Sequence, residues 1–141
     1  MKTIFTGCFL LLMAVSFSGY GQCDPDVHAD ACIPKLTKGF IFLKSYKLDG
    51  QEGERKKIEY SYVFSKGRQY QINLCTANPD DADGIVINVF DSGRKLVGSS
   101  KQGGKYLTGI QLACRSTGIY YIQYAFENSA TYCAGSALGF Q

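Results

Sequence analysis

The sequence contains no tryptophan, three prolines and a single histidine, His28, among its 141 residues. Because the chain also has no CxxC pair, one histidine is too few for the usual zinc sites. A Ser–His–Asp or Cys–His catalytic group would have to use His28, which lies in a segment without a regular pattern near the N-terminus. The sequence therefore predicts a protein that is not an enzyme.

An excess of charge is also missing. The formal net charge is +3, one unit of which belongs to Lys2, and basic clusters such as residues 55–57 are short. A balance so close to neutral argues against nucleic acid or an anionic membrane surface as the partner. After the N-terminal segment no apolar run approaches 20 residues, so we expect no transmembrane segment.

The N-terminal segment has the pattern of a signal peptide. Lys2 supplies a basic start, residues 4–17 are an apolar run, and Gly19 and Gly21 are the small residues that a signal peptidase requires. We expect a signal peptide over 1–21, an N-terminal arm over 22–38 and one domain over 39–141. The mature protein is then secreted, periplasmic or held at the cell surface.

Five cysteines remain once Cys8 leaves with the signal peptide, and in an exported chain they indicate disulfides. They are Cys23, Cys32, Cys75, Cys114 and Cys133. Alternating strand directions place Cys75 and Cys133 at one end of the domain, which predicts a bridge between them. The second bridge is either Cys32–Cys114 or Cys23–Cys32. The odd cysteine is unpaired, buried or joined to another molecule.

Period-two alternation dominates the chain from Gly39 onward. Tyr60, Tyr62 and Phe64, for example, alternate with more polar neighbours, and glycine-containing turns separate such runs at short intervals. We expect strands near 40–48, 56–64, 68–75, 84–91, 94–100, 106–114, 118–126 and 131–139. With no long amphipathic helix, this pattern predicts an all-β fold: an antiparallel, jelly-roll-like β-sandwich of about eight strands, preceded by an irregular arm.

Three segments in order, residues 60–74, 85–97 and 117–122, resemble the bacterial pre-peptidase C-terminal domain. Shared features are a Lys66-Gly67 turn, a hairpin around Asp91 and a late Thr-Gly-x-Tyr-Tyr strand. The resemblance covers about residues 56–126. It implies a non-catalytic β-sandwich that assists secretion, localisation or substrate binding. The chain departs from the family because it has no attached protease and carries extra cysteines.

Two acidic sets are candidate metal ligands. Asp80, Asp81 and Asp83 crowd one turn, and their carboxylates could hold Ca²⁺; otherwise they form an ordinary charged turn. No other cofactor is expected. The second set alternates along the arm: Asp24, Asp26, His28 and Asp30. In an extended segment these side chains would face one way, as metal ligands or simply as a polar, mobile arm.

The strand over 119–126 has bulky residues on both faces. One face presents Tyr120, Tyr124 and Phe126, which we take as candidates for an exposed binding face. Alternatively these residues are buried with their polar tips reaching water. The opposite face presents Ile119, Tyr121 and Gln123.

The sequence thus predicts a secreted, non-catalytic binding module that engages an extracellular glycan or protein. Two alternatives stay open. One is a small secreted hydrolase that uses His28 or a pair of carboxylates, for which Glu59, Glu127 and Asp91 are the candidates. The other is a structural or inhibitory protein that acts through an intermolecular disulfide.

Overall fold

A computed structural model describes residues 22–141, so the signal peptide predicted over 1–21 lies outside the described residues. The elements, with η marking short 3-10 helices, are α1 (Pro25–Cys32), η1 (Ile33–Lys35), β1 (Ile41–Asp49), η2 (Gln51–Gly53), β2 (Lys57–Phe64), β3 (Gln69–Cys75), η3 (Pro79–Ala82), β4 (Ile85–Phe90), β5 (Leu96–Ser99), β6 (Lys101–Gln102), β7 (Lys105–Tyr106), β8 (Gly109–Ala113), β9 (Gly118–Phe126) and β10 (Cys133–Phe140).

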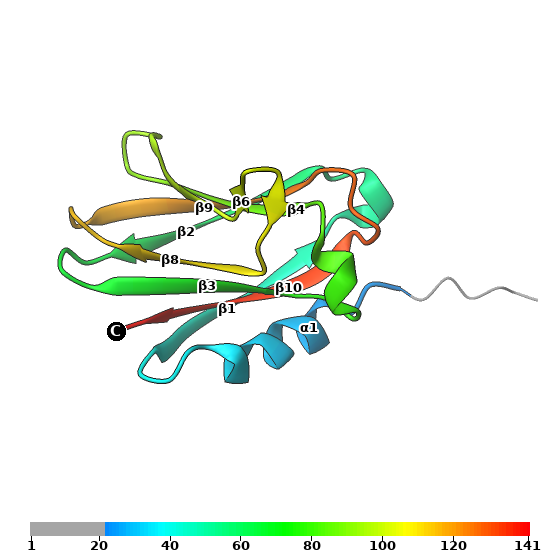
Figure 1. Cartoon of the computed structure of the whole chain (residues 1–141), viewed down its shortest axis with the longest axis horizontal. Helices are drawn as coiled ribbons and strands as arrows, with labels where there is room; N and C mark the ends of the chain where they lie inside the picture. The colour runs from blue at the N-terminus through cyan, green and yellow to red at the C-terminus, as the bar shows by residue number, and fades with distance from the viewer. Residues whose placement is uncertain (1–21) are drawn as a thin grey trace, which may run out of the picture.

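Eight of these strands form two antiparallel four-stranded sheets that pack face to face (Figure 1). The first sheet has the order β1-β10-β3-β8 and the second has the order β2-β9-β4-β5. The chain crosses between the sheets at each connection except the β4–β5 hairpin, which is the strand order of a jelly roll. The predicted antiparallel sandwich is confirmed, and the small β6–β7 hairpin interrupts the region between β5 and β8.

The core lies between the sheets and consists of the inward-facing residues of the alternating strands. Phe64, Tyr124 and Leu138 are fully buried there. Tyr124 of the second sheet donates a hydrogen bond from its hydroxyl to Ser136 Oγ of the first sheet, at 2.6 Å. This bond satisfies two buried polar groups and joins the two layers.

The expectation of an irregular arm over residues 22–38 is wrong, because the segment contains α1, which lies across the outer face of the first sheet (Figure 1). Pro25 occupies the first turn, where a missing N–H costs nothing. The outer face of β10 presents Gly135, Ala137 and Gly139, which let the helix approach closely. A Cβ placed on Gly135 would lie 2.0 Å from the backbone N of Ala29.

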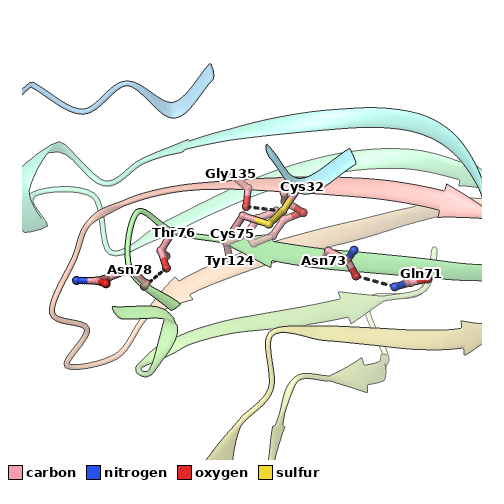
Figure 2. The surroundings of a disulfide bond; sticks show 9 residues. Cys32, Gln71, Asn73, Cys75, Thr76, Asn78, Tyr124 and Gly135 are labelled. Atoms are coloured by element: carbon pink, nitrogen blue, oxygen red, sulfur yellow. Dashed lines mark hydrogen bonds between the residues drawn. A yellow bond between two sulfur atoms is a disulfide. The ribbon is translucent and has the colours of Figure 1, made fainter. Parts of the chain in front are cut away.

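The predicted disulfide pairing is also wrong. The bridges are Cys23–Cys133, with Cα atoms 5.4 Å apart, and Cys32–Cys75, at 5.7 Å. Cys75 and Cys133 do lie at the same end of the sandwich, but each pairs with a cysteine from the N-terminal segment. The helix separates Cys23 from Cys32, so each reaches a different strand. Figure 2 shows the bridge between the end of α1 and β3.

Candidate binding surface

The two ends of the sandwich carry opposite charge. Three turns gather at one end, the left of Figure 1: residues 65–68, 91–95 and 114–117. We call them the basic loop end, because they carry Lys66, Arg68, Arg94, Lys95 and Arg115. The opposite end, formed by residues 49–56, 76–84 and 127–132, carries Asp49, Glu52, Glu54, Asp80, Asp81, Asp83 and Glu127, together with Arg55 and Lys56.

Hydrogen bonds hold the three turns of the basic loop end together. The backbone N–H of Lys66 donates to Thr117 Oγ1 at 2.9 Å, and the hydroxyl of Ser92 donates to the carbonyl of Ile119 at 2.8 Å. The carboxylate of Asp91, the acidic residue of these turns, accepts backbone N–H groups within its own turn. The basic side chains are therefore displayed from a connected frame.

A cleft of about 810 Å³ opens at this end between the edges of the two sheets. Its walls come from β5 and β8 and include Leu96, Val97 and Leu112, and Tyr120 also lines it. Leu96 is 51% exposed and Val97 43% exposed. Lys95, Arg115 and Asp91 line the same cleft, so its aliphatic side chains lie beside two basic groups and one acidic group.

The outer face of the second sheet adds an ordered arginine next to this cleft. The guanidinium of Arg94 lies 3.6 Å from the centre of the Tyr121 ring and donates hydrogen bonds to both carboxylate oxygens of Glu59, each at 2.9 Å. Val63 and Ile119 lie opposite one another on β2 and β9 and are both exposed. Arginine and tyrosine are enriched at protein-binding hot spots, whereas valine and leucine are under-represented there.

The binding face predicted for Tyr120, Tyr124 and Phe126 is wrong, because all three side chains are buried in the core. The predicted alternation exists, but the opposite set, Ile119 and Tyr121, faces outward. Burial raises the pKa of Tyr120 to about 12, and a hydrogen bond with the Cys114 thiol adds to the shift.

Cys114 is the odd cysteine, and it is unpaired and buried. Its sulfur lies 3.1 Å from the carbonyl oxygen of Ser116 and 3.5 Å from the hydroxyl of Tyr120. A thiol enclosed in this way is not available to another molecule. Burial of Cys114 thus argues against an intermolecular disulfide, whereas the structural or inhibitory role itself stays a prediction.

The predicted metal ligands fall into two places. Asp80 and Asp81 lie on η3 and Asp83 follows it, and within residues 22–141 no group of three or more His, Cys, Asp or Glu side chains is arranged to hold a metal ion. The alternating set around Asp26 and His28 lies on or next to α1. Residues two apart on a helix point to different sides, so the shared face predicted for that set is wrong. Asp26 instead pairs with Lys47 at 2.7 Å.

The candidate catalytic residues are not brought together. His28 lies on α1 and makes no side-chain hydrogen bond within the described part of the chain. Glu59 pairs with Arg94, and Glu127 pairs with Lys101 at 2.8 Å. Both carboxylates are thus held by cations on the surface.

Comparison with known proteins gives a distant structural likeness. No protein-family model and no curated protein matches the sequence. The structure is similar to the crystal structure of Aeromonas hydrophila PliG, a periplasmic lysozyme inhibitor of g-type lysozyme. The TM-score is 0.47 and the identity 19%, over 75% of this chain and 91% of that chain. This likeness is too distant to assign an activity or a partner. In the described residues no helix is long and apolar enough to cross a membrane.

Proposed function

We propose that this protein is a non-catalytic module that binds another protein through its basic loop end, outside the cytoplasm. The supporting observation is that large apolar side chains are exposed mainly at this end. Most of those in the described residues sit within two residues of a strand end at the basic loop end: Ile41, Phe42, Val63, Leu96, Val97 and Ile119. Contiguous exposed apolar groups mark interaction surfaces, and two such pairs lie at this end: Leu96 and Val97 at the cleft, and Val63 and Ile119 on neighbouring strands.

Charge indicates the chemistry of the partner. Lys66, Lys95 and Arg115 are exposed and form no ion pair among the described residues, so their charge is free to act on an incoming molecule. A partner with an acidic surface would be attracted over distance and oriented as it arrives.

The side chains favour a protein over a glycan. Sugars commonly stack on exposed aromatic rings, but the ring of Tyr121 on this surface is already covered by the Arg94 guanidinium. Apart from Phe42, which lies on β1 at the other edge of the first sheet from β8, the large groups that remain exposed at this end are aliphatic and cationic. They suit a protein surface with apolar and acidic side chains.

The two disulfides support a location in an oxidising compartment. Together with the signal peptide expected over 1–21, they suit a secreted, periplasmic or cell-surface protein. The resemblance to pre-peptidase C-terminal domains stays a prediction, and it agrees with a binding role.

Affinity purification from the extracytoplasmic fraction of the source cells tests the proposal. The wild type is compared with Lys66→Glu/Lys95→Glu/Arg115→Glu at the basic loop end and with Glu52→Lys/Glu54→Lys/Asp80→Lys at the opposite end. None of these six side chains forms an ion pair among the described residues. We expect quantitative mass spectrometry to find a protein enriched by the wild type and the second variant but lost with the first. If nothing is enriched by the wild type, or the first variant retains the same proteins, the proposal is wrong.

A further inference from the structure

One edge of the first sheet lacks the usual protection against pairing with another chain. The sheet edges are β1, β8, β2 and β5. Proteins guard such edges with charged residues, prolines, bulges or very short strands. β1 carries two lysines and a register shift, β2 carries Lys57 and Glu59, and β5 has four residues and a register shift. β8, with the sequence GIQLA, has neither a charged residue nor a proline.

The hydrogen bonds at both ends of β8 show which of its backbone groups are free. The N–H of Leu74 donates to the carbonyl of Thr108 at 2.7 Å, and the N–H of Cys114 donates to the carbonyl of Arg68 at 2.9 Å. Bonded pairs alternate along an antiparallel ladder, so Ile110 and Leu112 bond to β3. The N–H and C=O groups of residues 109, 111 and 113 therefore face away from β3, toward the open edge.

This edge coincides with the cleft of the basic loop end. Gln111 and Ala113, two residues with outward backbone groups, line the cleft. The sheets come together at Gly98, where an added Cβ would lie 3.7 Å from Ile110 Cδ1 and 4.0 Å from Leu112 Cδ2. From that point toward the basic loop end the edges of β5 and β8 are separated by the cleft.

We propose that β8 takes up an extended segment of the partner protein as an additional strand. Free backbone groups of residues 111 and 113 pair with the segment, as in other strand-addition complexes. An apolar side chain of the segment sits between Leu96, Val97 and Leu112, and acidic side chains face Lys95 and Arg115. This inference rests on the proposed function. It identifies β8 as the strand that binds the partner and an acidic, apolar segment as what it binds.

Charge argues against a second copy of this chain as the occupant. Pairing β8 with β8 would bring two basic loop ends together, and like charges at close range repel. An acidic, apolar segment has the complementary charge. The mass of the protein in solution is measured as part of the test, and a stable dimer that Gln111→Pro dissociates would overturn the choice of occupant.

The test begins with a selection of random displayed peptides of about ten residues against the oxidised chain from Gln22 onward. The affinity of the selected peptides for the wild type, for Gln111→Pro and for Gln111→Ala is then measured by fluorescence anisotropy. Proline at 111 removes an outward N–H without breaking a bond to β3, whereas alanine removes only the side chain. We expect enrichment of alternating acidic and apolar residues. We expect binding at least about tenfold weaker with Gln111→Pro and within about twofold of wild type with Gln111→Ala.

A second measurement leaves the protein unchanged. Selected peptides are resynthesised with N-methyl groups on alternate amides, which blocks strand pairing in one of the two registers. Loss of binding in one register supports strand addition even if Gln111→Pro fails to fold. Equal binding of both registers, or a selection that enriches no acidic–apolar peptide, would overturn the inference. If the charge-reversal purification succeeds while these results are negative, only the strand-addition mode is wrong and the proposed function stands.

Discussion

At the scale of single residues, two buried tyrosines illustrate opposite outcomes of placing a phenol in the core. Tyr124 is completely buried, and its hydroxyl bonds to the equally buried Ser136. Tyr46 is also buried, but its hydroxyl has no hydrogen-bond partner within residues 22–141. Burial raises the pKa of both phenols, so both stay neutral well above the pH at which an exposed tyrosine ionises. A paired buried polar group is close to neutral for stability, whereas an orphaned one is costly.

Replacing each tyrosine by phenylalanine should therefore have effects of different sign. Tyr124→Phe leaves Ser136 Oγ without its partner and should lower the free energy of unfolding by about 1–3 kcal/mol. Tyr46→Phe removes an orphaned hydroxyl and should leave the stability unchanged or raise it by about 1 kcal/mol. Urea unfolding of both variants measures the difference. Equal destabilisation by the two substitutions would contradict the hydrogen-bond assignment.

At the scale of elements, α1 is held in place by contacts with other parts of the chain and not by its own sequence. It is tied at its C-terminal residue by Cys32–Cys75 and just before its start by Cys23–Cys133. Between these bridges the helix rests directly on the backbone of β10. An eight-residue helix is too short to be stable alone, so packing and covalent tethering maintain it.

A methyl group introduced at this contact should displace the helix. Gly135→Ala would place a Cβ 2.0 Å from the backbone N of Ala29, so α1 must shift away from β10 against the two disulfides that tether it. We expect a loss of about 3 kcal/mol in the free energy of unfolding. Gly98→Ala is the control, because its Cβ makes only ordinary contacts at 3.7 Å or more. Its effect should stay below about 1 kcal/mol. Similar melting temperatures for the two variants would show that α1 does not pack as described.

The strands could be predicted from the sequence, and the helix could not, for a physical reason. Alternation such as Tyr60-Ser61-Tyr62 and turns such as Ser65-Lys66-Gly67 are local signals. By contrast, α1 depends on Gly135 and Ala137, about a hundred residues later, and its own sequence has little amphipathic character. The disulfide pairing depends on the helix, so it was predicted wrongly for the same cause.

The candidate binding surface could have been predicted only by combining two signals: the alternation along each strand and the direction of the strands, which decides where the charged turns lie. Alternation divided β9 correctly into Ile119 and Tyr121 on one face and Tyr120 and Tyr124 on the other, but it cannot say which face meets the first sheet. The charge separation could have been found by tracing strand direction, which brings the turns after β2, β4 and β8 to one end. The cleft depends on how far the sheet edges separate, and sequence alone carries no such signal.

At the scale of the whole molecule, the sandwich works as a rigid frame that separates two surfaces. Acidic turns lie at one end, while basic side chains, exposed aliphatic groups and the cleft lie at the other. The small net charge therefore conceals a strong asymmetry. Such an asymmetry orients the protein as it approaches an acidic partner and presents the basic loop end first.

Site-specific photo-crosslinking in the source cells tests the binding surface most directly. A photoreactive phenylalanine derivative replaces Ile119 or Val97 at the basic loop end, or Val27 on α1 as an exposed apolar control. We expect covalent adducts of one defined mass with the first two positions and none with the third. Adducts only at position 27, or no adduct at any of the three positions, would contradict it.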